Sequence, residues 1–309
     1  MERAMSKMLT VNDFERAKDF IKSQARPLDR RLFDYHFESG LAEAVIAELA
    51  KFQNSDGGFG NGLEPDFRMQ ASSPVATTVA FQHLSEIGAT ADEELVKQGV
   101  GYFISSYDTE QRRWHQPGKE VNDAPHAPWW SYEEGRDTFG WANPGVEIIG
   151  YLHKYSSLVP QDFLSGVTEI ALSHIRDTPD GSMDVHSMLS YLRELDFLPE
   201  PGKGIALEKL IKSAQTGLTS SPGWPGDGAR LSWYAPTPAS PLADALKAEI
   251  ERNLDSEIDD QAEDGSWLPN WSWVQYEDTW EEANREWKGY LTVQMLKTLL
   301  AYRRMRPPL

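Results

Sequence analysis

Apolar residues recur with a helical period along most of the chain. Residues 40–53, GLAEAVIAELAKFQ, carry them at positions 41, 45, 46, 49 and 52, close to the repeat of an amphipathic helix. A second helix is predicted to follow, because Ser73 can cap it, Pro74 suits its first position and a glycine ends it. Convincing strand patterns are absent from the sequence. The pattern predicts an all-α protein.

Further helical patterns occur in pairs. Because a helix hairpin cannot bury both of its faces alone, neighbouring hairpins have to stack. An open solenoid and a closed ring both satisfy this requirement, and periodicity alone does not choose between them. The predicted pairs are 91–107 with 144–155, 160–175 with 187–195, and 240–254 with 283–305, and residues 204–218 supply another helix.

A turn motif repeats between the helices. QNSDGGFG at 53–60 is echoed by QAEDGSW at 261–267, each with a glutamine three residues before Asp-Gly and an aromatic residue shortly after. Weaker copies are TPDGSMD at 178–184 and PGDGARLSW at 225–233, and YDTEQRRW at 107–114 is interpreted as a degenerate copy without the glycine. The repeats indicate about five helix–turn–helix units, with the N-terminal helices as a possible sixth pair.

The two best turns resemble the Gln-Trp repeat motifs of squalene–hopene cyclases and the similar turns of protein prenyltransferase β subunits. The resemblance extends over about residues 40–303. It implies an α/α toroid of about five to six helix hairpins, in which residues 1–309 form a single domain. It also implies that residues 1–39 pack on the ring, that the insertion 108–143 lies over the cavity mouth, and that the turn glutamines tie successive pairs together.

The chain departs from this superfamily at its chemistry. Class II cyclases protonate an alkene with an Asp-x-Asp-Asp motif, and the nearest string here, EIDD at 257–260, precedes a turn instead of following it. Prenyltransferase β subunits bind zinc through Asp, Cys and His, and this chain has no cysteine. The resemblance therefore does not imply the cyclase reaction or the prenyltransferase reaction in its usual form.

The GLEPDF turn offers the first candidate acids. Glu64 and Asp66 bracket Pro65, which fixes the backbone between them. If both face an aromatic cavity, repulsion and desolvation raise one pKa and leave the other carboxylate ionised, as in a general acid beside a stabilising carboxylate. The alternative is a capping acid with an ion pair to Arg68.

The segment DAPHAPWW offers a candidate proton-transfer group. His126 stands between two prolines, near Asp123, and histidine titrates near neutral pH. Consecutive inner helices of a ring are neighbours, so their entry loops overhang one mouth of the cavity. Glu64, Asp66, Asp123 and His126 are therefore predicted to converge as catalytic residues. A metal site drawn from these residues is an alternative without supporting ligand spacing, and neither a metal nor a cofactor is predicted.

The tryptophans concentrate in the later part of the chain, and all 11 follow residue 113. Several stand in loop-like segments with proline, asparagine and serine, where aromatic residues often line a binding site. The predicted substrate-binding residues are Phe59, Trp129, Trp130, Trp141, Trp271 and Trp273.

Charge and composition limit the classes of molecule that the protein is expected to bind. The net charge of −18 argues against nucleic acid, because phosphate binding needs a basic face. The absence of cysteine, of a signal-peptide core and of a membrane-length apolar run predicts a cytoplasmic protein with no membrane span. The expected partner is a small-molecule substrate.

Three functions follow from these patterns. The first is an enzyme that performs acid/base chemistry on an apolar, isoprenoid-type molecule, in the manner of a terpenoid cyclase. The second is a carbohydrate-active hydrolase or lyase, because α/α rings also host paired carboxylates and sugar-stacking tryptophans. The third is a small-molecule binding or scaffold protein without catalysis.

Overall fold

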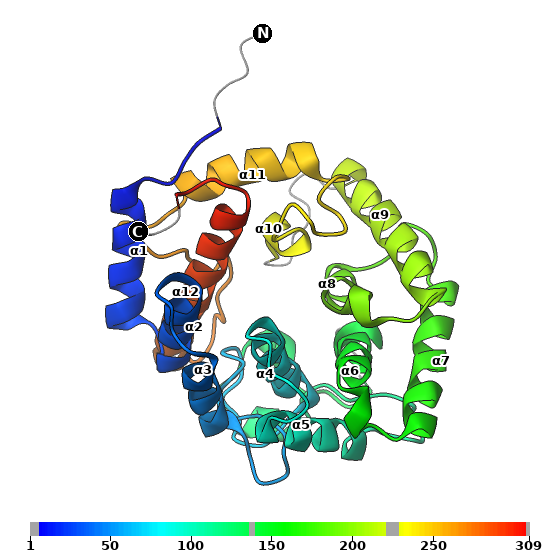
Figure 1. The fold of residues 1–309 in the computed structure, drawn as a ribbon. Coiled ribbons are helices and arrows are strands. Elements are labelled where there is room, and N and C mark those ends of the chain that lie inside the picture. The colour runs from blue at the N-terminus through cyan, green and yellow to red at the C-terminus, as the bar shows by residue number, and fades with distance from the viewer. Residues whose placement is uncertain (1–5, 136–139, 221–228, 307–309) are drawn as a thin grey trace. The chain divides into compact units, whose positions relative to one another are not determined.

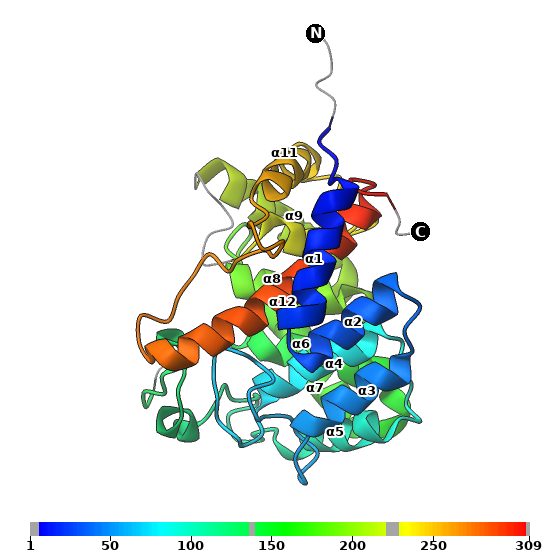
Figure 2. The ribbon, with the colours of Figure 1, turned by 90° about the vertical axis from the view of Figure 1, so that its left-hand side faces the viewer.

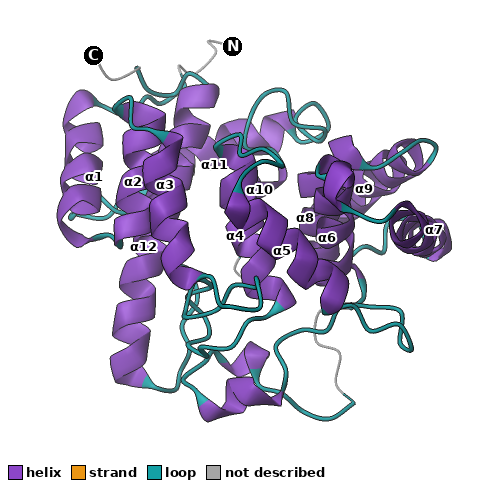
Figure 3. Ribbon diagram, turned by 60° about the horizontal axis from the view of Figure 1, so that its bottom comes forward, coloured by secondary structure: helices purple, strands orange, loops and turns teal. Residues whose placement is uncertain are grey.

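The computed structural model describes residues 6–135, 140–220 and 229–306. Within these residues the chain forms twelve α-helices and no strand (Figure 3). The prediction of an all-α protein is confirmed. None of the helices in these ranges is both long enough and apolar enough to cross a membrane.

The helices are α1 (Val11–Gln24), α2 (Pro27–Phe37), α3 (Ala42–Leu49), α4 (Pro74–Glu86), α5 (Glu94–Ser105), α6 (Ala142–Lys154), α7 (Gln161–Asp177), α8 (Val185–Glu194), α9 (Gly202–Ser220), α10 (Leu231–Tyr234), α11 (Lys247–Asp259) and α12 (Glu277–Ala301). Short 3₁₀ segments are η1 (Ala50–Phe52), η2 (Lys119–Asp123), η3 (Pro128–Trp130), η4 (Ser156–Leu158) and η5 (Leu195–Phe197).

Side-chain caps fix several helix starts. The hydroxyl of Ser73 accepts a hydrogen bond from the backbone N–H of Ala76 at 3.0 Å, and Pro74 is the first residue of α4. The helix ends just before Gly88, whose φ of +73° belongs to the left-handed region. The start and end predicted for this helix are therefore confirmed.

Two helices differ from the predicted ranges near the C-terminus. Residues 240–246 form turns, and α11 begins only at Lys247. In contrast, α12 begins at Glu277, ahead of the predicted start at 283. Glu277 and Asp278 lie in its first turn, where carboxylates interact favourably with the helix dipole.

The chain divides into two compact units. Unit 1 comprises Met1–Val45, Gly217–Ser272 and Trp280–Leu309. Unit 2 comprises Ile46–Thr216 and Trp273–Thr279.

Unit 2 has two layers of helices. Helices α4, α6 and α8 lie side by side, and α5, α7 and α9 form the second layer (Figure 1). The core between the layers is aromatic: the ring centroid of Phe81 lies 4.9 Å from that of Phe103 and 5.3 Å from that of Tyr151. Helix α6 is buried along most of its length.

Unit 1 is built around α1 and α12, which lie against each other (Figure 2). The ammonium group of Lys288 on α12 lies 5.0 Å from the ring centroid of Phe20 on α1. Gly289 allows close packing here, because a Cβ at this position would lie 2.9 Å from the Cβ of Ala25. Arg26 and Asp29 form a buried ion pair of 2.7 Å in the same unit.

The first Asp-Gly turn joins three elements of unit 2. The side-chain amide of Gln53 donates to the carbonyl of Gly57 in its own turn at 3.0 Å and to the carbonyl of Leu95 on α5 at 3.2 Å. The backbone N–H of Phe59 donates to the hydroxyl of Thr77 on α4 at 3.0 Å. The turn thereby ties the helix that follows it to the next helix along the chain.

The turn at 261–267 makes the same bonds in unit 1. The side-chain amide of Gln261 donates to the carbonyls of Gly265 and Asp13, both at 2.9 Å. The backbone N–H of Trp267 donates to the hydroxyl of Thr292 on α12 at 3.0 Å. The turn glutamines were expected to tie helices together, and the bonds in both turns agree with this role.

Both turns need glycine for the same two reasons. Gly57 and Gly265 have φ values of +86° and +88°, which L-residues with a side chain rarely adopt. A Cβ would also lie 2.4 Å from the carbonyl oxygen of Gln98 or of Arg16 respectively. The turn therefore presses its glycine against the backbone of the helix that it joins.

The copy at 107–114 keeps this architecture without glycine. Arg112 occupies the position two residues before the aromatic residue and has a φ of +55°. The indole N–H of Trp114 donates to the carbonyl of Phe103 at 2.7 Å, as that of Trp267 does to Glu257 at 2.8 Å. These two features agree with the interpretation of this segment as a degenerate copy.

The remaining copies are described only in part. In the copy at 178–184, Gly181 has a φ of +73° and packs against Thr216, and Asp184 caps α8. The first residues of the copy at 225–233, and residues 136–139 of the predicted insertion 108–143, lie outside the described ranges.

The matched turns assign equivalent roles to helices far apart in the sequence. The first turn precedes α4 and docks on α5, the next helix along the chain. The second turn precedes α12 and docks on α1, the first helix of the chain. Helix α1 therefore completes the last repeat, in the place that α5 holds in the first.

Candidate functional site

The GLEPDF turn and the DAPHAPWW segment meet in unit 2. Phe67 and His126 form an isolated antiparallel bridge. The backbone N–H of Ala127 donates to the carbonyl of Asp66 at 2.8 Å, and that of Arg68 donates to the carbonyl of Pro125 at 2.9 Å. The structure thus brings together the two segments that were predicted to approach each other.

A third segment, residues 273–276, joins them through side chains. The indole N–H of Trp273 donates to Oδ1 of Asp66 at 2.8 Å, and the amide of Gln275 donates to the backbone carbonyl of His126 at 2.7 Å. Asp66 and Trp273 are both buried, and Glu64 is 9% exposed. We call this set of three segments the loop cluster.

The imidazole of His126 faces neutral partners. Its Nδ1 lies 2.7 Å from the carbonyl oxygen of Ala124, and its Nε2 lies 3.0 Å from the hydroxyl of Ser131. Because a carbonyl oxygen can only accept, Nδ1 carries a hydrogen and donates it to Ala124. The ring was predicted to lie among carboxylates. Its two nitrogens instead contact Ala124 and Ser131, which belong to the same loop as His126.

Asp123 does not join the loop cluster. It ends η2, is exposed and forms no hydrogen bond or ion pair with any described residue. Of the four predicted catalytic residues, three therefore lie in the cluster and the fourth lies outside it. Within the described ranges, no group of three or more potential ligand side chains is placed to hold a metal ion.

The predicted aromatic residues are distributed over several packing sites. In the loop cluster, the ring of Trp130 stands edge-on to that of Phe67 at 5.4 Å, and Trp129 is half-buried. Phe59 is fully buried in the first turn. These contacts serve the packing of the loops.

The other two tryptophans lie elsewhere. Trp141 has its ring centroid 4.9 Å from that of His174, and its N–H donates to the carbonyl of Arg112 at 3.1 Å. Trp271 belongs to unit 1, where its ring lies 5.1 Å from that of Trp287. Trp141 and Trp271 thus each pack against a ring that is not among the six predicted substrate-binding residues.

The segment 273–276 contains two strained residues. Val274 and Tyr276 have φ values of +54° and +50°, and the left-handed region is particularly costly for a β-branched residue. Val274 is 87% exposed, so packing does not compensate for its conformation. The strain places Trp273 and Gln275 on the inner side of the segment, where they reach the other two loops.

A second cluster, which the sequence did not predict, lies among α4, α6 and α8 of unit 2. Glu147 on α6 is 1% exposed. Its Oε1 accepts hydrogen bonds from the amide of Gln82 at 2.7 Å and the hydroxyl of Tyr151 at 3.1 Å, and its Oε2 accepts from Arg193 at 3.0 Å. Three donors, one of them a guanidinium, thus surround this carboxyl.

The neighbouring acid is Glu194 on α8, which is 2% exposed. Burial and then the negative charge of Glu147 raise its pKa well above the ordinary value. Its Oε2 atom is buried without a hydrogen-bond partner among the described residues. Burial therefore favours the protonated form of Glu194, and we call Glu147 and Glu194 the carboxyl pair.

Close packing of α6 on α8 creates this environment. A Cβ at Gly150 would lie 2.2 Å from the Cβ of Glu194, so only glycine permits this approach. Burial, followed by the charge of Glu147, also raises the pKa of Tyr151 well above its usual range. Burial lowers the pKa of the Lys154 amino group, against the opposing effect of Glu194.

The carboxyl pair has the chemical features of an acid/base site. A buried carboxyl whose pKa is raised can act as a proton donor, and here it stands beside a second carboxyl that accepts three hydrogen bonds. Arg193 has 38% of its side chain exposed, and Gln82 is half-buried. These two residues cover Glu147 on the side toward solvent.

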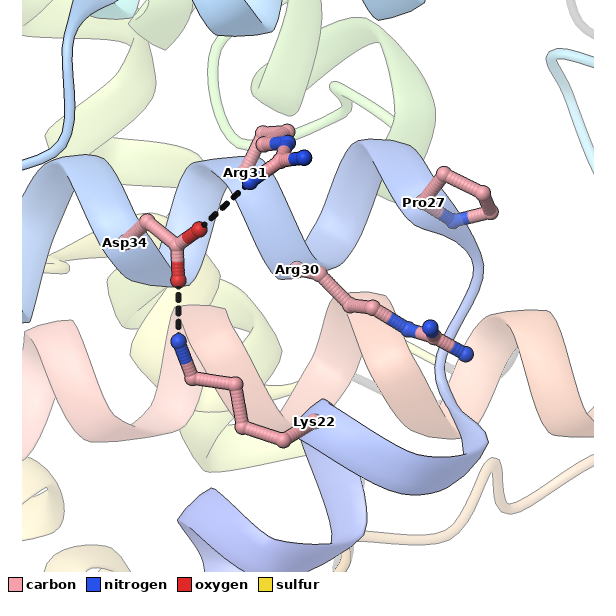
Figure 4. A pocket seen from close by; sticks show the side chains of 5 residues that line it. All are labelled: Lys22, Pro27, Arg30, Arg31 and Asp34. Atoms are coloured by element: carbon pink, nitrogen blue, oxygen red, sulfur yellow. Dashed lines mark hydrogen bonds and ion pairs between the residues drawn. The ribbon is translucent and has the colours of Figure 1, made fainter.

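Unit 1 carries surface hollows that are lined by its own residues. One has a volume of about 280 Å³ and lies at the junction of α1 and α2 (Figure 4). In this view Asp34 stands between Lys22 and Arg31 and pairs with both. Lys22 also pairs with Glu38, and the guanidinium of Arg30 donates to the carbonyl of Ala25, so each cationic side chain of this hollow already has a partner.

Comparison of the chain with models of protein families, with curated proteins and with solved structures finds no match.

Proposed function

We propose that this protein is an α/α-toroid enzyme that performs acid/base chemistry on an apolar, isoprenoid-type small molecule. Glu194 acts as the general acid, and Glu147 is the adjacent carboxylate that stabilises developing positive charge. The observation that carries the proposal is the carboxyl pair: Glu147 accepts hydrogen bonds from three donors, whereas the Oε2 atom of Glu194 is buried without a partner among the described residues, and burial raises the pKa of Glu194.

A closed ring of six helix pairs accounts for the repeat geometry. The turns at 53–60 and 261–267 use the same bonds to join a following helix to an outer one, and the last of these outer helices is α1. In such a ring, α2, α4, α6, α8, α10 and α12 form the inner wall. Glu147 and Glu194 then belong to inner helices, which line the cavity in toroidal enzymes.

The proposed reaction needs no co-reactant. The O–H bond of Glu194 breaks as its proton forms a C–H bond with an alkene carbon of the substrate, which leaves a carbocation. Glu147 and the newly formed carboxylate of Glu194 lie in a poorly solvated region, where their attraction for the cation exceeds its value in water. Loss of a different proton from the cation to Glu194 restores the acid, so the net reaction is an isomerisation or cyclisation.

The loop cluster has a positioning role in this proposal. Asp66 already binds the indole of Trp273, and both ring nitrogens of His126 have neutral partners. Glu64, Asp66 and His126 therefore hold three loops in place. Proton transfer is assigned to the carboxyl pair instead.

The second candidate is a binding or scaffold protein without catalysis. This candidate is favoured because the side chains of the loop cluster fill its interior, where Trp273 and Phe67 are fully buried. In this case the carboxyl pair only fixes the packing of α6 on α8.

An assay with two substrate panels separates the candidates. Purified protein is incubated with linear isoprenoids and, separately, with oligosaccharides, and the products are identified by mass spectrometry. Glu194→Gln is compared with wild type, with Glu208→Gln as the control, because Glu208 has 68% of its side chain exposed. We expect isoprenoid products whose rate of formation falls about 10²–10⁴-fold only in Glu194→Gln.

Other outcomes reject this function. Isoprenoid turnover that survives in Glu194→Gln would remove Glu194 from the chemistry. Turnover of sugars alone would indicate a glycan-active enzyme. A co-purified ligand that is retained without turnover would support the binding protein.

A further inference from the structure

A groove in unit 1 lies between α1, the turn at 261–267 and the first turns of α12. Its volume is about 570 Å³, which is within the range of small-molecule sites. The groove is independent of the carboxyl pair, which lies in unit 2. Its lining residues are Asp19, Phe20, Ser23, Gln24, Asp264, Glu281, Asn284, Arg285 and Lys288.

The groove owes its existence to an extension of α12. Thr77 and Thr292 are equivalent, because each accepts the backbone N–H of the aromatic residue in its turn. Thr77 is the fourth residue of α4, whereas Thr292 is the sixteenth of α12. Helix α12 thus begins about three turns earlier than its counterpart. All four groove residues on α12 lie in this added segment, which α4 lacks.

The floor of the groove is internally neutral. Lys288 pairs with Asp264 at 2.5 Å, and its ammonium group lies over the buried ring of Phe20. The charges of Lys288 and Asp264 neutralise each other, and the ring of Phe20 lies beneath the ammonium group. A ligand that enters the groove therefore meets the remaining charged groups first.

Three charged side chains of the groove are unpaired. Asp19, Glu281 and Arg285 form no side-chain hydrogen bond or ion pair with any residue in the described ranges. The amide side chains of Gln24 and Asn284 are likewise uncommitted within those ranges. The groove thus offers two carboxylates, one guanidinium and two amides to a ligand.

We propose that this groove binds a basic amino acid, with arginine or lysine as its ligand. Such a molecule carries two positive groups and one carboxylate, the complement of Asp19, Glu281 and Arg285. The guanidinium of Arg285 can hold the ligand carboxylate in a two-point contact. The net charge of −18 favours the approach of a ligand with a net positive charge.

Related ligands match the groove less well. A simple diamine satisfies the two carboxylates but places no anion against Arg285. A neutral amino acid pairs with Arg285 and one carboxylate, and leaves the other carboxylate unmatched. Both are therefore expected to bind more weakly than arginine.

Calorimetric titration of the full-length protein tests the proposal. The ligands are L-arginine, L-lysine, putrescine and L-leucine at low salt. We expect the dissociation constants of the two basic amino acids to be lower than those of putrescine and leucine by about tenfold or more. This factor corresponds to the loss of one charge-assisted contact. Asp19→Asn, Glu281→Gln and Arg285→Gln should each weaken arginine binding by a similar factor.

Matched variants outside the groove serve as controls. Asp244→Asn removes an exposed carboxylate of unit 1, and Arg252→Gln removes a guanidinium whose side chain is 70% exposed. Both should bind arginine as wild type does. Absence of arginine binding, equal affinity for all four ligands, or equal losses in groove and control variants would overturn the proposal.

Discussion

The side-chain amide of Gln261 donates a hydrogen bond of 2.9 Å to the backbone carbonyl of Asp13, 248 residues away in the sequence. Gln53 makes the equivalent bond to Leu95 on the helix that follows its own repeat. The first helix of the chain therefore serves the last repeat. This arrangement makes the stability of unit 1 depend on contacts between the two ends of the sequence.

The glycine of the 261–267 turn provides the first prediction. Gly265→Ala forces a side chain into the left-handed region, at a cost of about 1–2 kcal/mol. It also presses a Cβ against the backbone of Arg16, and such overpacking adds about 1–3 kcal/mol. Denaturant unfolding should therefore show a loss of roughly 2–5 kcal/mol.

Gly88→Ala is the matched control for this variant. Gly88 has a φ of +73°, but a Cβ there would meet nothing within 4 Å. It should lose only the conformational part, about 1–2 kcal/mol. Equal losses in the two variants would mean that the turn is not pressed against α1.

The bond between Trp273 and Asp66 gives the second prediction. Trp273→Phe removes the indole donor and leaves a buried carboxylate without it, which should cost about 1.5–3 kcal/mol of unfolding free energy. A double-mutant cycle with Asp66→Asn measures the coupling directly. Losses that simply add, within about 0.5 kcal/mol, would contradict a direct interaction.

The strained valine gives a prediction of opposite sign. Val274→Gly relieves the left-handed conformation at an exposed position and should stabilise the protein by about 1 kcal/mol. Val274→Ala keeps the strain and should give no comparable gain. A loss of stability in Val274→Gly would show that this side chain makes contacts that outweigh the strain.

The repeat turns could be predicted from the sequence because their chemistry is local. Gln53, Asp56 and Gly57 lie within five residues, and the left-handed glycine and the capping serine leave direct marks in the sequence. The meeting of Asp66 with His126 followed from the expected order of the loops. The contacts of the His126 imidazole could not be predicted from the order of the loops, because they depend on which neighbouring atom each ring nitrogen meets.

The carboxyl pair could not be predicted in the same way. Glu147 stands in an apolar helix between Val146 and Ile148, where an isolated acid is ordinarily expected to face solvent. Its partner Arg193 is 46 residues away. The acid in the middle of an almost wholly buried helix is the one signal that could have identified it.

The raised pKa of Glu194 predicts how stability depends on pH. The folded protein retains a proton that the unfolded chain releases above its ordinary pKa of 4.5. The stabilising contribution is therefore complete below about pH 4.5 and is lost as the pH rises toward the folded pKa. Within that window, wild type should lose about 1.4 kcal/mol per pH unit relative to Glu194→Gln.

The measurement is denaturant unfolding of both proteins at a series of pH values. Glu208→Gln, at an exposed position, should follow wild type throughout. If Glu194→Gln and wild type ran parallel from pH 5 to 8, the carboxyl of Glu194 would have the same pKa in the folded and unfolded chains.

The protonation state of Glu194 at neutral pH is the central claim, and infrared difference spectroscopy measures it directly. The spectrum of wild type minus Glu194→Gln should contain the carbonyl stretch of a protonated, poorly solvated carboxyl group, and this band should shift in deuterated buffer. A difference spectrum that contains only carboxylate bands at neutral pH would contradict the claim, because Glu194 would then be ionised and could not donate the proton assigned to it.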